Sequence, residues 1–183
     1  MRGRNNRLGG FSLIELMIAL ALLGIALGGG VPAFRGLLER QRSSALMMSL
    51  QQDIALARSY AALWQRRVSL CPSADQAHCG SDWSQGRLVF ADDNGNGSRE
   101  NGESILRHDD APVGLAMNWR SALRKPYLQF LPSGMTNHVN GSFVLCNEAK
   151  DRRSARALII NKMGRARASR DKNGDAGREF RRK

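Results

Sequence analysis

The sequence lacks the residue patterns on which common classes of enzyme depend. It contains no G-x-S-x-G, no P-loop motif and no H-E-x-x-H. Its three histidines, His78, His108 and His138, are isolated from one another in segments that we predict to be loops, so they form no catalytic or metal-binding cluster. The three glycines at 28–30 end an apolar run, whereas a nucleotide-binding loop would follow a strand. We therefore predict a protein that is not an enzyme and needs no cofactor.

Acidic residues are scarce. The 183-residue chain has 16 Asp and Glu against 28 Lys and Arg, and its net charge is +12. Most of this excess lies at the C-terminal end, where residues 150–183 hold 13 Lys or Arg and only 4 Asp or Glu. An end this basic is either a solvated tail or a surface that binds a polyanion.

Only one long apolar run is present, at residues 11–31. As a helix, its 21 residues would measure roughly 30 Å, enough to cross the hydrocarbon core of a membrane. Arg2, Arg4 and Arg7 precede the run, so the positive-inside rule keeps the N-terminus cytoplasmic and exports the rest. A cleavable secretory signal is not favoured, because the run is too long and no A-x-A site follows it.

Glu15 is the only charged residue in this run, and a carboxylate in lipid is costly unless it is paired. It either reaches the lipid headgroups or pairs with a cation. The string from Gly10 to Glu15, GFSLIE, resembles the class III signal of type IV prepilins and type II secretion pseudopilins. The resemblance implies that a prepilin peptidase cuts between Gly10 and Phe11, that Phe11 becomes N-methylated, and that Glu15 pairs with the N-terminal amine of a neighbouring subunit. It also implies a single-pass inner-membrane protein with a periplasmic C-terminal domain.

A second helical pattern continues through residues 32–66, where apolar residues recur every three or four positions. This stripe consists of Met47, Leu50, Ile54, Ala57, Ala61 and Trp64. We predict that it docks on a sheet, while the first half of the helix stays available to lipid or to neighbouring subunits.

Short apolar runs bounded by Pro, Gly, Asn or Asp follow the helix and predict strands. They lie at 68–71, 87–91, 104–107, 127–131, 142–146 and 157–160. We predict an α+β protein of the type IV pilin-like fold, in which the long N-terminal helix packs on a mainly antiparallel sheet. The predicted divisions are a leader (1–10), a transmembrane helix (11–31), its amphipathic continuation (32–66), a β-rich domain (67–167) and a flexible basic tail (168–183).

Three cysteines, Cys71, Cys79 and Cys146, lie in the part predicted to be exported. An oxidising compartment favours one disulfide among them. We favour Cys71–Cys79, which closes a short loop, and the alternative is Cys71–Cys146, which would link two strands. A zinc site is not favoured, because the segment has no C-x-x-C spacing.

Residues 92–97, Asp-Asp-Asn-Gly-Asn-Gly, match the pattern of a calcium-binding loop when taken with Glu103. The candidate ligands are Asp92, Asn94, Asn96 and Glu103. The flanking residues are predicted strands, unlike the two helices of an EF-hand, and Asp, Asn and Gly also suit a long hairpin turn. We favour the plain turn, so calcium is a secondary prediction and no metal site is assigned.

The predicted last strand runs into a segment rich in basic residues. Gly164 can turn the chain through a positive φ, and Arg165 and Arg167 would share one face of an extended segment. Two guanidinium groups on one face suit two phosphates. Lys162 and Arg170 are the nearest further cations of this candidate DNA-binding site.

Four segments resemble the GspH/FimT branch of pilin-like proteins: DWSQGRLVFADDNGNG, FLPSGM, NGSFVLC and GRAR. In FimT minor pilins a GRxR motif binds DNA during natural transformation, and Gly164, Arg165 and Arg167 match it. The resemblance implies a minor pilin of a type IV pilus that binds double-stranded DNA without sequence preference. Its partners would be other pilins, the prepilin peptidase and the inner membrane. The alternative is a GspH-like minor pseudopilin with a purely structural role in type II secretion, and the longer tail after Arg167 departs from the family.

Overall fold

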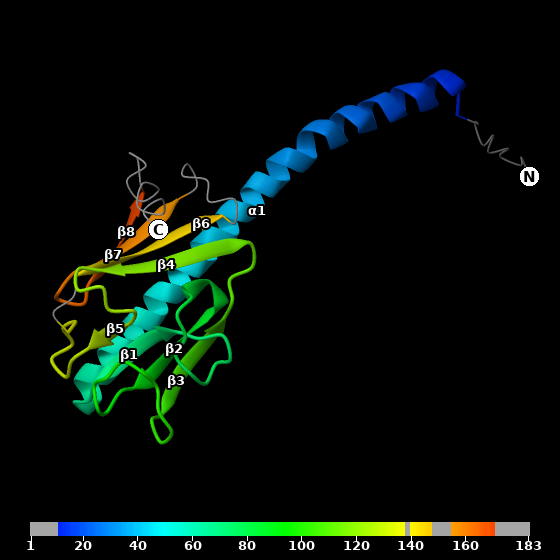
Figure 1. Cartoon of the computed structure of the whole chain (residues 1–183). Helices are drawn as coiled ribbons and strands as arrows, with labels where there is room; N and C mark the ends of the chain where they lie inside the picture. The colour runs from blue at the N-terminus through cyan, green and yellow to red at the C-terminus, as the bar shows by residue number, and fades with distance from the viewer. Residues whose placement is uncertain (1–10, 138–139, 148–154, 171–183) are drawn as a thin grey trace, which may run out of the picture. The chain divides into compact units, whose positions relative to one another are not determined.

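The computed structural model describes residues 11–137, 140–147 and 155–170, and the chain divides into two compact units, Met1–Arg40 and Gln41–Lys183. A long helix, α1 (Leu13–Trp64), precedes the strands (Figure 1). The later elements are β1 (Val68–Pro72), the short 3-10 helix η1 (Trp83–Gln85), β2 (Gly86–Ala91), β3 (Ile105–Asp110), β4 (Leu115–Ser121), β5 (Leu128–Phe130), β6 (Gly141–Asn147), β7 (Arg156–Ile160) and β8 (Ala166–Arg170). The predicted α+β class is confirmed.

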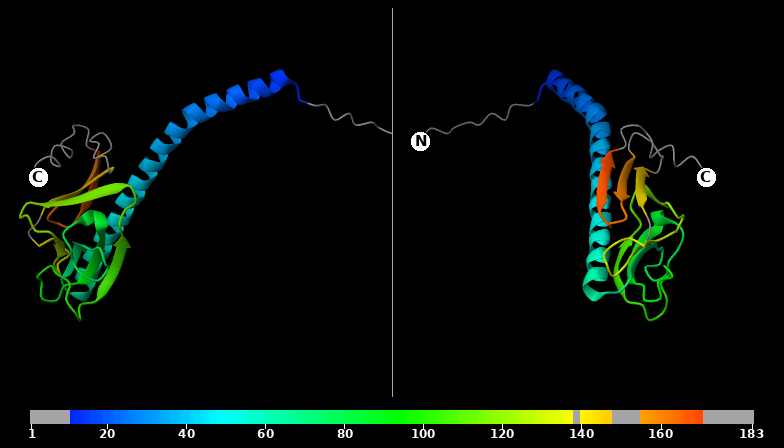
Figure 2. Two further views of the ribbon diagram at one scale, coloured as in Figure 1. Left: turned by 45° about the vertical axis from the view of Figure 1, so that its right-hand side comes forward. Right: turned by 90° about the vertical axis from the view of Figure 1, so that its left-hand side faces the viewer.

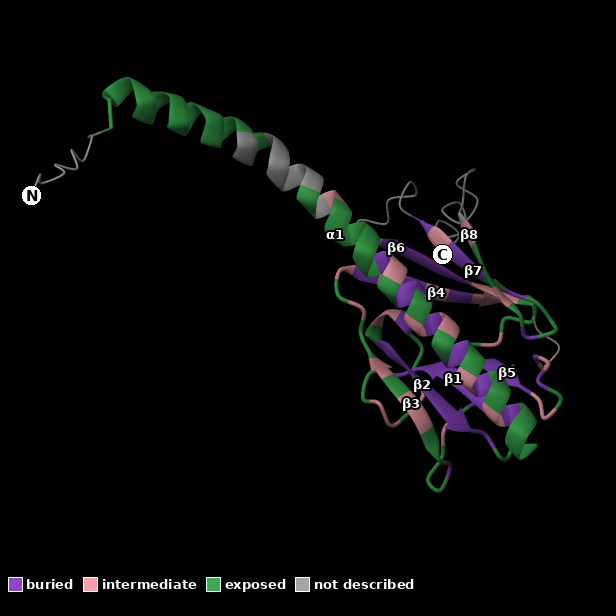
Figure 3. Cartoon of the chain, turned by 180° about the vertical axis from the view of Figure 1, so that it is seen from behind, coloured by how far each residue is buried: buried purple, intermediate pink, exposed green. Residues whose placement is uncertain are grey.

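The first unit contains the N-terminal part of α1. At its start, Ser12 O accepts hydrogen bonds from Glu15 N (3.0 Å) and Leu16 N (3.1 Å). The large apolar side chains from Phe11 to Ile25 are exposed (Figure 3). Within the described residues, no helix has a stretch long and apolar enough to cross a membrane. The predicted leader, 1–10, and the side chains at 26–27, 29–33 and 35 lie outside the described set.

In the second unit, the C-terminal part of α1 buries one face. Its apolar side chains there are at most 8% exposed: Leu46, Met47, Leu50, Ile54, Ala57 and Ala61. They form one cluster with residues of both sheets, so the predicted stripe is confirmed as far as Ala61. Trp64, predicted to end the stripe, is instead 60% exposed. The helix ends at Trp64, and Gln65 follows with a φ of 51°. The Trp64 ring lies beside the ring of Tyr60, with 5.9 Å between their centroids, and outside the apolar cluster.

The strands form two antiparallel sheets rather than the single sheet expected (Figure 2). One has the order β3-β2-β1-β5, and the other has the order β4-β6-β7-β8. The apolar cluster around α1 draws on both sheets, and Figure 3 shows the helix passing across them. The helix therefore joins two sheets that share no strand.

Strands β4 and β8 were missing from the prediction. In β4, buried Leu115, Met117 and Trp119 alternate with more exposed residues, so a search for unbroken apolar runs overlooked it. Strand β8 has no large apolar side chain and forms through its pairing with β7. The predicted tail boundary is therefore wrong, because the strand runs to Arg170; residues 171–183 lie outside the described residues. Strand β3 is also longer than predicted, and it places His108 in a strand rather than a loop.

A buried ionic network fixes α1 to the β2–β3 pair. Arg87 of β2, only 2% exposed, donates through Nε to Asp53 of α1 and through Nη2 to Asp109 Oδ2 (2.9 Å) and Ser49 Oγ (2.6 Å). Arg107 Nε lies 3.0 Å from Asp53 Oδ1. Burial raises the pKa of Asp53, against the lowering effect of Arg87. The register of helix on sheet thus rests on charges as well as on apolar contacts.

Candidate nucleic-acid interface

A tight turn joins β7 to β8 and carries the predicted DNA-binding residues. Gly164 N donates to Asn161 O (2.9 Å), Arg165 N donates to Asn161 Oδ1 (3.0 Å), and Asn161 N donates to Arg165 O (3.2 Å). Gly164 has a φ of +72°, the left-handed conformation that favours glycine. The turn therefore depends on a glycine at this position.

Gly164 also lies too close to its neighbours for any side chain. A Cβ at this position would lie 2.7 Å from the carbonyl oxygen of Gly134, 3.0 Å from the ring of Phe130 and 3.3 Å from Cδ of Arg58. The oxygen belongs to the backbone, so no change of rotamer can relieve that contact. Gly164 thus brings the turn against the β5–β6 loop and against α1.

Thr136 holds the turn from the β5–β6 loop. Its backbone N and its Oγ1 both donate to Lys162 O, at 3.1 and 3.2 Å. These bonds use only the backbone of Lys162, whose residue is exposed. The turn is therefore held by main-chain hydrogen bonds, while the side chain of Lys162 faces solvent.

The two arginines of the motif are exposed on either side of a residue that faces the core. Ala166, between them, packs against the main apolar cluster, and Arg165 and Arg167 are exposed. Arg167 lies directly opposite Ile159 of β7. The predicted site residues thus lie in a turn and an edge strand rather than beyond the last strand. Arg170 is the last residue of β8, and its side chain lies outside the described set.

Sequence reasoning missed one cation of this surface. Arg58 of α1 is exposed, and its side chain lies beside both Gly134 and Gly164. Among the described residues, Arg58, Lys162, Arg165 and Arg167 have no ion pair and no side-chain hydrogen bond. No local pattern marks Arg58, because more than 100 positions separate it from the turn.

Two family models match this chain. Residues 46–164 match the family model described as type II transport protein GspH, and residues 5–31 match the prokaryotic N-terminal methylation motif. The chain belongs to the GspH family. It is accordingly a minor pilin or pseudopilin, of a type IV pilus or a type II secretion system.

Solved structures of the same fold come from both kinds of assembly. The type IV minor pilin FimU of Pseudomonas aeruginosa strain PAO1 is 21% identical, with a TM-score of 0.55, over 72% of this chain and 91% of that chain. The minor pseudopilin EpsH from the type 2 secretion system of Vibrio cholerae is 12% identical, with a TM-score of 0.52, over 71% of this chain and 98% of that chain. At these identities the likeness shows the fold alone. A comparison with curated protein sequences finds no match.

In this GspH-family chain, the loop predicted as a turn or a calcium site is held by its own hydrogen bonds. Asp92 Oδ2 accepts from Gly97 N (3.0 Å), and Asn94 Oδ1 accepts from Asn96 N (3.0 Å). Asn96 Oδ1 accepts from Ser98 N. The two carboxylate oxygens of Glu103 accept from the backbone N–H groups of Asp93 and Glu100. A calcium ion would have to compete with these donors, although Asp92 Oδ1 is buried without a hydrogen-bond partner in the described part of the chain. Nowhere among the described residues do three or more His, Cys, Asp or Glu lie as metal ligands would, and calcium binding stays a prediction.

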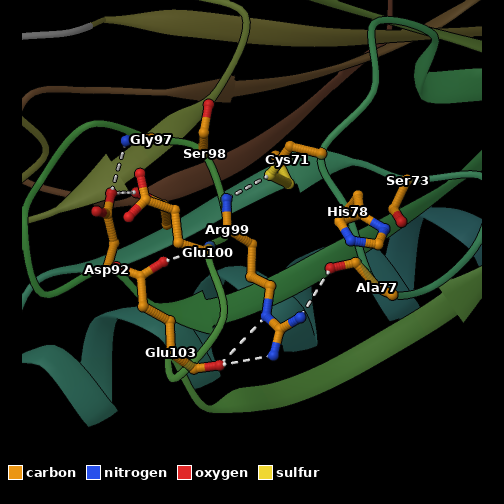
Figure 4. The surroundings of a disulfide bond; sticks show 12 residues. Cys71, Ser73, Ala77, His78, Asp92, Gly97, Ser98, Arg99, Glu100 and Glu103 are labelled. Carbon is orange, nitrogen blue, oxygen red and sulfur yellow. Dashed lines mark hydrogen bonds between the residues drawn. A yellow bond between two sulfur atoms is a disulfide. The ribbon is translucent and has the colours of Figure 1, made fainter.

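A disulfide joins Cys71 to Cys79, the pairing favoured from the sequence (Figure 4). Cys146 is buried on β6. Arg99 ties the closed loop to the Asp92 loop, because its N donates to Cys79 Sγ (3.4 Å) and its Nη1 to Ala77 O (3.4 Å). The disulfide therefore supports the long turn that follows β2.

Asp75 organises the inside of the disulfide loop. Its Oδ1 accepts from Ala77 N (3.0 Å) and His78 N (2.8 Å), and its Oδ2 lies 2.7 Å from Nδ1 of His78. The His78 hydrogen bond, followed by the two backbone bonds, holds the pKa of Asp75 well below its usual range. The residues predicted for processing and assembly lie elsewhere. Phe11, just before α1, and Glu15, in its first turn, are exposed, and Gly10 lies outside the described residues.

Proposed function

We propose that this chain is a minor pilin of a type IV pilus that binds double-stranded DNA without sequence preference, for uptake in natural transformation. The observation that carries the proposal is the β7–β8 turn. There Gly164 holds a left-handed turn and Ala166 faces the core, so Arg165 and Arg167 face solvent together without an acidic partner among the described residues. Arginine forks in such a pair suit phosphate oxygens, and phosphate contacts carry no sequence information.

The excess of positive charge supports the same function. Residues 150–183 hold 13 Lys or Arg against 4 Asp or Glu, so the motif lies in the most basic part of the chain. Such a field attracts polyanions over a distance of about one Debye length, roughly 8 Å at physiological salt. The DNA would first meet the field of the whole end and then the two arginines.

Assembly and location form part of the proposal. A prepilin peptidase removes residues 1–10, Phe11 is N-methylated, and residues 11–31 anchor the chain in the inner membrane with the β-rich domain in the periplasm. The match of residues 5–31 to the N-terminal methylation motif supports this processing. Glu15, in the first turn of α1, would pair with the N-terminal amine of the neighbouring pilin.

A structural pseudopilin of a type II secretion system is the second candidate. It is favoured by the description of the matching family model and by the likeness to EpsH. Such a protein would contact only other pseudopilins and secreted proteins. The two candidates differ in whether the C-terminal surface binds DNA, which one measurement separates.

The test is the salt dependence of DNA binding by the full chain, purified in detergent, with duplexes of unrelated sequence. Each phosphate contact contributes about 0.9 to the slope of log affinity against log salt, so Arg165→Gln with Arg167→Gln should make the slope shallower by roughly 1.8. DNA uptake should fall while pilus assembly is retained.

As a control, Arg178, Arg181 and Arg182, which lie outside the described residues, are changed to Gln together. This triple variant should have the smaller effect on the slope. If the wild-type chain fails to bind DNA at low salt, the pseudopilin candidate replaces this proposal.

A further inference from the structure

Arg58 of α1 lies against the turn that carries the DNA-binding motif. Its Cδ is 3.3 Å from the point where a Cβ of Gly164 would be, and its Nε is 3.6 Å from the corresponding point at Gly134. The same helix face continues through Ala62, which lies at 3.7 Å from that Gly134 position. Gln65, the first residue after the helix, donates through Nε2 to Pro132 O (3.4 Å). Successive turns of this face of α1 therefore lie along the β5–β6 loop.

This contact orders the aliphatic part of the Arg58 side chain and leaves the charge of its guanidinium group unneutralised. The hydrocarbon part of Arg58 rests on two residues that have no side chain, and within the described part of the chain its guanidinium has no acidic partner. Arg66, two residues beyond the end of α1, differs because it is paired with Asp93 through Nε and Nη2. Holding a free arginine in place costs side-chain entropy, and the packed stem of Arg58 has lost part of that entropy already.

We propose that Arg58 is a further phosphate-binding residue of the DNA interface, supplied by α1 to the surface of Lys162, Arg165 and Arg167. This inference rests on the function proposed above. The interface is then composite: the turn gives Lys162 and Arg165, β8 gives Arg167, and the helix gives a third guanidinium. Gly164 brings the parts together, because any side chain there would separate the turn from Arg58.

Arg58→Met tests the charge without removing the stem, since methionine keeps an unbranched apolar chain at this position. In the full chain in detergent, with random-sequence duplex DNA, the salt slope should become shallower by about 0.9, and the thermal midpoint should not change. In the Arg165→Gln, Arg167→Gln background the same further decrease is expected, because each guanidinium contacts its own phosphate. Arg58→Lys should keep the slope.

Arg66→Met is the control, since it removes one positive charge from an exposed arginine just beyond the end of the same helix. If the wild-type chain binds DNA but Arg58→Met has the wild-type salt slope, this inference is wrong and the proposed function stands. An equal decrease with Arg66→Met also overturns it, because net charge would then explain both results. Absence of DNA binding by the wild-type chain overturns the proposed function, and this inference with it.

Discussion

A methyl group added at Gly164 has two separate costs. The positive φ of +72° costs an L-residue about 1–2 kcal/mol, and the new carbon would lie 2.7 Å from the carbonyl oxygen of Gly134. Gly164→Ala should therefore lower the thermal midpoint of the full chain in detergent. Gly114→Ala is the matched control, because Gly114 has a φ of +73° and its closest neighbour, a flexible arginine, is 3.5 Å away. Equal losses in the two variants would show that the turn is not closely packed on its neighbours.

The pKa of the Asp75 carboxyl group depends mainly on its contact with His78. His78 contributes the largest lowering of its pKa, so His78→Ala should raise that pKa toward its ordinary value of 3.8. Titration of the Asp75 carboxyl carbon by NMR measures this directly. Gln76→Ala is the control, because Gln76 bonds to Asp110 instead.

The pH dependence of this contact follows from the direction of the shift. A carboxyl group whose pKa is lowered in the folded state stabilises the fold above its unfolded pKa, and that contribution disappears as the pH falls through the lower, folded value. The disulfide loop should therefore lose its internal order only below about pH 4. Loss of order near neutral pH would contradict the role given to Asp75.

At the scale of elements, the Asp53–Arg87 pair decides how α1 sits on β2 and β3. Asp53→Ala leaves Arg87, 2% exposed, without its closest counterion, and breaking such a buried pair typically costs about 3–5 kcal/mol. We expect a large fall in the free energy of unfolding, measured with denaturant. Asp93→Ala breaks the exposed pair with Arg66 and should cost only about 0–1 kcal/mol. Similar losses in both variants would mean that the buried pair contributes little.

The elements found from the sequence are those whose signal is local. The helical stripe up to Ala61 and the apolar runs of β1 and β2 are fixed by periodicity and burial, so the pattern predicted them. Strand β8 has only small and basic side chains, and its backbone pairing with β7 comes from the sheet rather than from its own residues. Division of the strands into two sheets likewise depends on long-range pairing, which one sequence does not reveal.

The candidate site was predicted in part for the same reason. Gly164, Arg165 and Arg167 are neighbours in the chain, and a short motif marks them. The contact of Arg58 with this turn and the support from Thr136 join distant segments, so neither has a signature in the sequence. The missed residues are those that the fold, and not the chain, brings together.

At the scale of the whole molecule, Glu15 is the residue proposed to pair with a neighbouring subunit in the fibre. Glu15→Val removes a charge from the predicted membrane segment, so membrane insertion should continue, whereas incorporation into a fibre should fall because the pairing with a neighbouring amine is lost. Immunoblots of membrane and sheared-fibre fractions measure the two effects. Glu39→Val, in the same unit but 24 positions further on, is the control and should assemble as the wild type does. Normal assembly of Glu15→Val would show that Glu15 only reaches the lipid headgroups.

Strand β8 is the last in the order of its sheet, and in the described part of the chain it pairs only with β7. An open edge of this kind is a template on which a strand from a second molecule can add, and charged side chains along it oppose such aggregation. Arg167, an exposed charged residue of β8, would therefore oppose the addition of a second strand at this edge, independently of any nucleic acid. An apolar residue at this position would remove that protection and favour pairing between chains through their sheets.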